Sequence, residues 1–259
     1  MRQKIGLAFV LFIVFSALAI SAVFFTKYLI SKEPKLVFFE WVWPHQKAEH
    51  DVLSEFEYCH RRTKRCRMAG PRFLIGTFER SGKYVSHLRV QRALSGEEPI
   101  GLVWRLEALI SPHRVAREIK SALSFFSDLR VPVEFLFIDY DSPSERLKHY
   151  ADWIRLLRSQ QLQLPISVSG LASWSFDNLE GFKELVENVE TVSVQLYQGA
   201  QKVELHDNLV SALERLDNVH ISLFCPDTGF LDHFFKKVSI SRQLDIGIFD
   251  GSGCSNLSE

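Results

Sequence analysis

The chain has 259 residues, of which 46% are hydrophobic and 12% aromatic, and 21 of the aromatic residues are phenylalanine. This composition excludes an intrinsically disordered protein, because the chain carries enough apolar side chains to bury a sizeable core. The 31 basic and 31 acidic residues cancel, so no global field favours nucleic acid and we expect no nucleic-acid partner.

The first 26 residues predict a membrane anchor. Residues 5–25 carry no charge, and about 20 apolar residues span the hydrocarbon core of a bilayer. Arg2 and Lys4 precede this segment and further lysines follow it, so the positive-inside rule favours an inside N-terminus only mildly. A cleaved signal peptide is one alternative, with Ala17-Leu18-Ala19 as its cleavage site. A buried helix of a soluble protein is the other.

The anchor and the cleaved signal peptide both place the rest of the chain outside the cytoplasm. We expect an uncleaved signal anchor at 1–26, a short junction at 27–35 and one exported domain at 36–259. The protein would then be a single-pass protein of the inner (cytoplasmic) membrane, with its C-terminal domain on the periplasmic or extracellular side.

The four cysteines invite disulfides if the domain is exported. Cys59 and Cys66 form one candidate pair, and Cys225 and Cys254 form another, with free buried thiols as the alternative. No cysteine or histidine spacing suggests zinc, so we expect no metal and no cofactor.

Eight short apolar runs alternate with helical patterns after the anchor. Strands that are separated by helices predict βαβ units and a parallel sheet. The predicted strands are Leu36–Trp43, Arg72–Phe78, Ile100–Leu106, Glu134–Asp141, Ile166–Ser173, Thr191–Tyr197, His220–Cys225 and Asp245–Asp250.

The helical patterns between these strands differ in quality. Ser111-Pro112 predicts a helix start with a serine N-cap and proline at the first position. Ser142-Pro143-Ser144-Glu145 predicts a capping box at the start of the next helix. The remaining candidates are Asp177–Glu187, Asp207–Leu216, Phe230–Val238 and a weak helix at Arg80–Pro99.

Eight strands and up to seven helices predict an α/β fold, a small (β/α)8 TIM-type barrel that lacks its last helix. A doubly wound open sheet is the alternative. A nucleotide-binding sheet of that kind typically has a glycine-rich phosphate-binding turn after the first strand. This chain has Trp43-Pro44-His45 there, which argues against nucleotide binding.

Two acids end the predicted strand Glu134–Asp141, on the side of the barrel where active sites lie. Alternation places Asp139 and Asp141 on the same face as Phe135 and Phe137. Two close carboxylates raise each other's pKa, so that one can act as an acid near neutral pH, as in glycosidases. In the structural alternative, Asp139 anchors a neighbouring strand and Asp141 caps the following helix.

Polar side chains on two other strands could complete this site. Gln195 and Tyr197 share one face of their strand and could donate hydrogen bonds to a sugar or to a reacting oxygen. Arg105 shares a face with Glu107 and could pair with it, or it could neutralise Asp139. A hydrated barrel interior is the alternative explanation for this polar face.

Tryptophans follow two of the predicted strands. Trp43 ends the first strand and Trp174 follows the fifth. At a barrel mouth such rings suit stacking on sugar rings, and ordinary core or rim packing is the alternative.

Several segments together resemble one bacterial family. They are Trp41-Val42-Trp43, Phe137–Asp141, Arg146-Leu147, Tyr150–Trp153, Leu171–Trp174 and Val194–Tyr197. In this order they resemble the bacterial domain-of-unknown-function 3142 family, whose members look like small glycosidase-type barrels that are exported or lipid-anchored. The resemblance covers residues 36–250 and implies the barrel fold, but it lends no established reaction.

The segment Asp139-Tyr140-Asp141 also resembles the strand motif Asp-x-x-Asp-x-Asp-x-Glu of chitinase-like barrels. Ser142 and Pro143 follow it here, so the glutamate of that motif is missing. Glu145 lies two positions late. This departure argues against substrate-assisted chitinase chemistry.

Two hypotheses follow for the function. The first is a membrane-anchored exported barrel that binds and hydrolyses an envelope glycan, with Asp139 as acid and base and Asp141 as its partner. The second is a non-catalytic barrel that serves as a binding or scaffold module in the cell envelope. An Asp139 sealed from solvent and paired with Arg105 would favour the second hypothesis, whereas two acids facing an open cleft with Tyr197 would favour the first.

Overall fold

The computed structural model describes residues 36–43, 66–87, 99–198, 201–202, 205–224, 228–239 and 243–249. All of them belong to one unit of the chain, Lys35–Glu259. The predicted anchor and junction lie outside the described residues. Within the described ranges, no helix is both long enough and apolar enough to cross a membrane.

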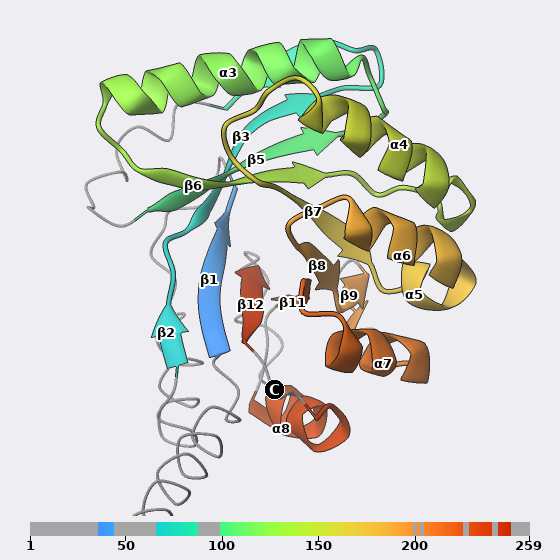
Figure 1. Ribbon diagram of the computed structural model, residues 1–259. Helices are drawn as coiled ribbons and strands as arrows, with labels where there is room; N and C mark the ends of the chain where they lie inside the picture. The colour runs from blue at the N-terminus through green and yellow to red at the C-terminus, as the bar shows by residue number, and fades with distance from the viewer. Residues whose placement is uncertain are drawn as a thin grey trace, which may run out of the picture. The chain divides into compact units, whose positions relative to one another are not determined.

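Eight parallel strands close into a barrel (Figure 1), so the predicted α/β barrel is confirmed. In barrel order, the strands are β1 (Leu36–Val42), β3 (Arg72–Phe78), β5 (Ile100–Leu106), β6 (Val133–Asp139), β7 (Ile166–Leu171), β8 (Val192–Gln195), β11 (Val219–Phe224) and β12 (Leu244–Phe249). Strand β12 pairs with β1, and β1 pairs with β3 at Trp41 and Val42, which completes the ring.

Four further short strands of the described ranges lie outside this ring. Strand β2 (Cys66–Met68) pairs with the first half of β1, and β4 (Tyr84–Ser86) runs antiparallel to β3. Strands β9 (Tyr197–Gln198) and β10 (Gln201–Lys202) form a small antiparallel ladder.

The hairpin of β3 and β4 corrects the weak helix predicted over Arg80–Pro99. Its turn contains Gly82 at a φ of 80°, a left-handed conformation that glycine adopts without strain. The chain therefore reverses at this turn and continues as strand β4, and residues 88–98 lie outside the described part.

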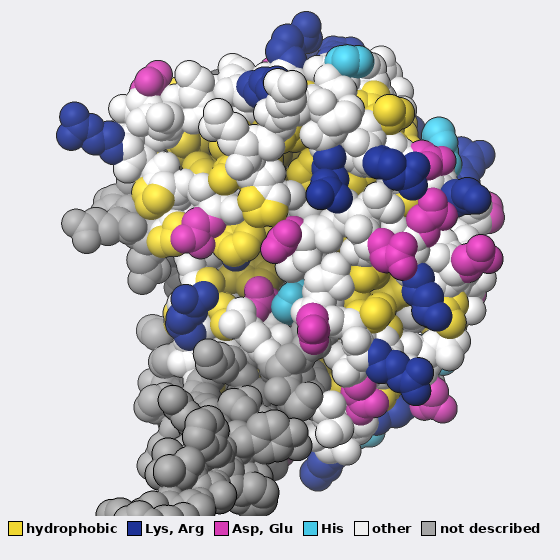
Figure 2. Space-filling model, in the orientation of Figure 1, with side chains coloured by type: hydrophobic (Ala, Val, Ile, Leu, Met, Phe, Trp, Pro, Cys, Tyr) yellow, Lys and Arg dark blue, Asp and Glu magenta, His cyan; other side chains and the backbone are white. Residues whose placement is uncertain are grey.

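The helices lie outside the strands of the barrel (Figure 1), as the βαβ pattern predicts. They are α3 (Pro112–Asp128), α4 (Leu147–Arg158), α5 (Trp174–Asp177), α6 (Leu179–Glu187), α7 (Asp207–Arg215) and α8 (Thr228–Lys237), with a short 3-10 helix, η2 (Ser144–Arg146). On the face shown in Figure 2, acidic and basic side chains are intermixed. One group of ion pairs joins two helices: Arg155 of α4 pairs with Asp152 of the same helix at 2.6 Å and with Glu184 of α6 at 3.2 Å.

The predicted capping box is wrong. The Ser142 hydroxyl donates to the Pro143 carbonyl at 3.2 Å instead of capping a helix, and α4 begins only at Leu147. The cap that does form was not predicted. The side chain of Asn178 accepts a hydrogen bond from the Gly181 N–H at 3.0 Å and caps α6. The helix predicted as Asp177–Glu187 therefore begins at Leu179, and Asp177 belongs to the preceding short helix, α5.

Alternation along the strands builds two separate cores. Leu36, Phe38 and Val42 of β1 belong to the large core that the helices cover. Phe39 and Trp41, on the opposite face, belong to a second core of strand residues that fills the barrel interior. This interior core is aromatic: the rings of Trp41 and Phe249 stack with centroids 5.1 Å apart and planes 8° apart.

A buried arginine completes the interior near the start of the strands. Arg72 is 3% exposed, donates from Nη1 to the Gly70 carbonyl at 3.0 Å, and lies 4.3 Å from the Phe135 ring centroid. Burial lowers the pKa of Arg72 to about 10, although the negative charges of Asp245 and Glu134 act in the opposite direction.

Gly247→Ala should lower the free energy of unfolding by about 1–3 kcal/mol through overpacking. A Cβ at this position would lie 2.3 Å from Nε1 of Trp41 and 2.8 Å from Cζ of Phe39. Urea unfolding measures the cost. The same substitution should cost less in a Trp41→Phe background, which lacks the indole nitrogen, and an equal cost in both backgrounds would contradict this packing.

Cys66, the one cysteine in the part of the chain that the structure describes, is disulfide-bonded. The other three cysteines lie outside that part, so both predicted pairings remain predictions.

Candidate functional site

The register of the sheet aligns a row of polar side chains that lies near the C-terminal ends of β3, β5 and β6 and continues into β7 and β8. Thr77 of β3 is the partner of Arg105 on β5, and Arg105 is the partner of Asp139 on β6. Asp139 in turn pairs in register with Ser169 on β7, and Ser169 with Ser193 on β8. The row lies on the side of the barrel where active sites of this architecture occur.

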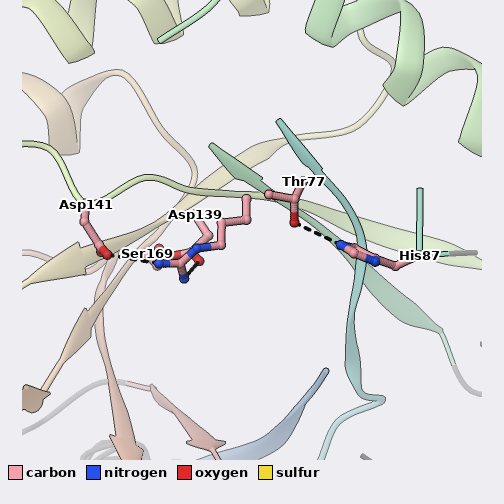
Figure 3. Close-up of polar contacts among 6 residues, drawn as sticks. Thr77, His87, Asp139, Asp141 and Ser169 are labelled. Carbon is pink, nitrogen blue, oxygen red and sulfur yellow. Dashed lines mark hydrogen bonds and ion pairs between the residues drawn. The ribbon is translucent and has the colours of Figure 1, made fainter. Parts of the chain in front are cut away.

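Asp139 lies inside the barrel and has two donors (Figure 3). Arg105 Nη1 donates to its Oδ2 at 2.9 Å, and the Ser169 hydroxyl donates to its Oδ1 at 2.5 Å. Asp139 is 5% exposed. Of the two partners predicted for Arg105, Asp139 is therefore the right one. Glu107 instead accepts the backbone N–H of Arg80 at 3.1 Å.

Asp141 lies two residues beyond the end of β6 and is exposed. Its side chain is 47% exposed, and its Oδ2 lies 3.5 Å from Arg105 Nη2. Partial burial raises the pKa of Asp141, the negative charge of Asp139 raises it further, and Arg105 acts in the opposite direction. The two predicted acids are thus close together but differ in environment: Asp139 is enclosed, and Asp141 faces the mouth.

Arg105 connects the acids to an aromatic side chain. Its side chain is 37% exposed, and its Cζ lies 5.6 Å from the ring centroid of Trp43. Trp43 is partly buried and lies 5.9 Å from Phe249, ring centroid to ring centroid. Trp43 therefore lies beside the polar row, where the sequence placed it.

Tyr197 lies on the face predicted for it, although it belongs to β9 and not to β8, the strand of Gln195. Val194 of β8 packs in the outer core, whereas Tyr197 packs on the interior core, with its ring centroid 5.5 Å from that of Phe249. Gln195 follows Val194 on β8, so alternation places it on the opposite face of that strand. Burial raises the pKa of the Tyr197 hydroxyl, as do the charges of Asp139 and Asp141. Tyr197 is therefore a neutral hydroxyl at physiological pH, able to donate a hydrogen bond.

Trp174 does not lie at the barrel mouth, so the prediction that it stacks on a ligand is wrong. Its side chain is fully buried, and its indole N–H donates to the Ser142 carbonyl at 2.7 Å. The ring packs 6.1 Å from Tyr150 in the outer core. The alternative that the sequence left open, ordinary core packing, is correct for this residue.

Small polar residues of the interior were missed. Beyond Ser169, the Ser193 and Ser222 hydroxyls share a hydrogen bond of 2.6 Å, and Trp41 Nε1 donates to Ser222 at 3.1 Å. The alternation of serine with apolar residues in Ile166–Leu171 could have indicated that Ser169 faces the barrel interior. It could not have indicated the hydrogen-bond partner of this serine, because the partner lies on a neighbouring strand.

A second polar contact near the row was also missed. The Thr77 hydroxyl lies 3.0 Å from Nε2 of His87 (Figure 3). His87 directly follows β4, in the stretch where the sequence predicted a helix. No sequence signal therefore placed it beside β3.

The cavity that the described residues form beside Asp139 is small. A cavity between Trp41, Arg72, Asp139 and Phe249 measures about 10 Å³, which is about the size that one water molecule needs. A sugar ring does not fit there, so a ligand would contact Asp141 and Arg105 at the mouth. Among the described residues, no group of three or more histidine, cysteine or acidic side chains could hold a metal ion.

Comparisons with known proteins do not identify a family. No family model and no curated protein matches the chain. Among solved structures, the chain is similar to the Bacillus cereus spore cortex-lytic enzyme SleL, with a TM-score of 0.46 and 10% identity over 74% of this chain. It spans about half of that enzyme, 51% of its length. Two mutant tryptophan synthase α-subunits from Pyrococcus furiosus align with a TM-score of 0.40 each, at 12% and 11% identity, over 83% of this chain and 88% of theirs.

Proposed function

We propose that the barrel is a non-catalytic module that binds a carbohydrate of the cell envelope at its C-terminal mouth. The observation that carries this proposal is the state of Asp139. It is enclosed, paired with Arg105 and bonded to Ser169. An acid in that position orients the guanidinium of Arg105, and the cavity that the described residues form beside it, about 10 Å³, does not admit a sugar ring.

The mouth retains groups that suit a carbohydrate. Arg105 and Asp141 are partly exposed and offer charged donors and acceptors, and hydrogen bonds to charged groups are the stronger ones. Trp43 offers an aromatic surface beside them. The envelope as the source of the ligand follows from the predicted anchor at 1–26, which would hold the barrel near the membrane on its outer side.

A second candidate function, glycoside hydrolysis, is favoured by the placement of two acids on one guanidinium: Arg105 lies 2.9 Å from Asp139 and 3.5 Å from Asp141. Partial burial and the negative charge of Asp139 also raise the pKa of Asp141. A carboxylic acid with a raised pKa can serve as the proton donor of a glycosidase. The roles would then differ from those predicted from the sequence, because Asp141 would be the acid and Asp139, held by two donors, the charged partner.

Binding of glycan fragments by the full-length protein tests the first candidate. We expect peptidoglycan disaccharides and longer glycan strands to bind, as measured by isothermal titration calorimetry. Asp141→Asn should weaken binding about tenfold or more, because a hydrogen bond to a charged group contributes about 1.5–3 kcal/mol.

The matched control for this experiment is Asp152→Asn. Asp152 is 48% exposed and pairs with an arginine, as Asp141 does, but it lies on α4. It should leave the Kd unchanged. Equal affinities of wild type and Asp141→Asn for every bound glycan, or a wild type that binds none, would contradict the proposal.

A further inference from the structure

We infer that Trp174 is the positioning residue for Asp141 and that it acts through the carbonyl group of Ser142. This inference rests on the proposed function, in which Asp141 contacts the ligand at the barrel mouth. It gives a role at the site to a tryptophan that cannot itself reach a ligand, because its side chain is fully buried.

The barrel sheet does not fix Asp141, because β6 ends at Asp139. Asp141 is instead the central residue of a tight turn. The Ser142 backbone N–H donates to the Tyr140 carbonyl at 2.8 Å and closes that turn. The backbone position from which Asp141 reaches Arg105, 3.5 Å away, therefore depends on the contacts that hold the turn in place.

Trp174 holds the turn on the side next to Asp141. Its indole N–H donates to the Ser142 carbonyl at 2.7 Å, and both residues are completely buried. The ring lies against Gly170 of β7, where an added Cβ would be 2.9 Å from Cζ3 of the indole. Gly170 follows Ser169, the donor to Asp139. The Trp174 side chain thus links β7, whose Ser169 donates to Asp139, to the turn that contains Asp141.

Two further contacts hold the loop beyond the turn. Asn178 Nδ2 donates to the Ser144 carbonyl at 2.6 Å, and the Ser144 hydroxyl donates to Asp177 at 3.3 Å. The bond from Trp174 is the buried one of the three contacts and lies nearest to Asp141. Water cannot replace a buried donor easily, so loss of this bond should loosen the turn most.

Replacement of Trp174 by phenylalanine tests the inference, because phenylalanine fills most of the site and lacks the N–H donor. The measurement is an NMR titration of the Asp141 carboxyl group in the full-length protein. We expect the pKa of Asp141 to fall toward its ordinary range in Trp174→Phe, because a loosened turn lets the carboxylate move into water and away from Asp139.

Trp153→Phe is the matched control. Trp153 is 5% exposed, and its indole N–H also donates to a backbone carbonyl, that of Ile110, at 2.6 Å. That bond does not involve the turn of Asp141, so the pKa of Asp141 should stay as in the wild type. An unchanged pKa in Trp174→Phe, or an equal shift in both variants, would overturn the inference.

A measurement on the wild type covers the case in which Trp174→Phe does not fold. The indole N–H resonance of Trp174 should shift with the titration of Asp141, and that of Trp153 should not. Identical behaviour of the two resonances would count against the inference. Neither titration requires a ligand, so a failure to bind any glycan would overturn the proposed function without affecting this result.

Discussion

Trp41→Ala should lower the free energy of unfolding by about 3–5 kcal/mol, the usual cost of removing a large aromatic side chain from a core. Trp41 is 3% exposed at the centre of the barrel interior. Its ring lies 5.1 Å from both Phe249 and Phe137, centroid to centroid. Alanine leaves a void that these rings cannot fill, because the closed barrel fixes the strands that carry them.

Urea unfolding followed by circular dichroism measures this loss in the full-length protein. Leu156→Ala is the control, since Leu156 is 58% exposed on α4 and should change the free energy of unfolding by about 0.5 kcal/mol or less. Trp41→Phe separates packing from hydrogen bonding. It keeps a ring but leaves the Ser222 hydroxyl without the indole donor, at a cost of about 1 kcal/mol. A loss below 1 kcal/mol in Trp41→Ala would show that the interior is not packed as the structure has it.

The strands were predictable because each one is a short, nearly continuous run of apolar residues. Arg72–Phe78 and Ile100–Leu106 have the predicted bounds. Buried strands of a parallel barrel are covered on both faces, so nearly every position is apolar and the run itself marks the strand. The C-terminal ends of the strands were harder to predict. The strand predicted as Glu134–Asp141 ends at Asp139, because the tight turn around Asp141 follows directly.

The pairing of side chains across strands was only partly predictable. Arg105 had two possible partners in the sequence, and the choice between Glu107 and Asp139 depends on the register of β5 and β6. Trp174 shows the same limit. The sequence placed it correctly after the fifth strand, but an indole at that position can turn to the mouth or to the helices. The carbonyl of Ser142 provides its acceptor on the helix side.

Local helix signals failed where tertiary contacts overrode them. The serines of Ser142-Pro143-Ser144-Glu145 suit a capping box, but the carbonyl groups of Ser142 and Ser144 accept hydrogen bonds from Trp174 and Asn178. These bonds hold the segment as a loop and a 3-10 turn, and the α-helix starts later. The segment for which the helix prediction was wrong thus directly follows Asp141 in the loop of the candidate site.

Turnover of glycan strands separates the two candidate functions. As a non-catalytic module, the wild-type protein should release no reducing ends from peptidoglycan above the uncatalysed rate. As a hydrolase, it should release them, and Asp141→Asn should lower kcat by about 10²–10⁴-fold, the usual contribution of a general acid. The hydrolase would be active with Asp141 protonated, so its rate should fall as pH rises through the raised pKa of that carboxyl group.

Asp139→Asn completes this test because the two acids have different surroundings. Asparagine keeps the size of the side chain but removes the charge that Arg105 and Ser169 contact. In a hydrolase this change should also lower kcat, and it should shift the pH profile to lower pH, because the charge of Asp139 helps to raise the pKa of Asp141. In a non-catalytic module, Asp139→Asn should instead weaken glycan binding through Arg105, with no turnover in either protein. Turnover that persists unchanged in both Asp139→Asn and Asp141→Asn would exclude this carboxylate pair as the catalytic site.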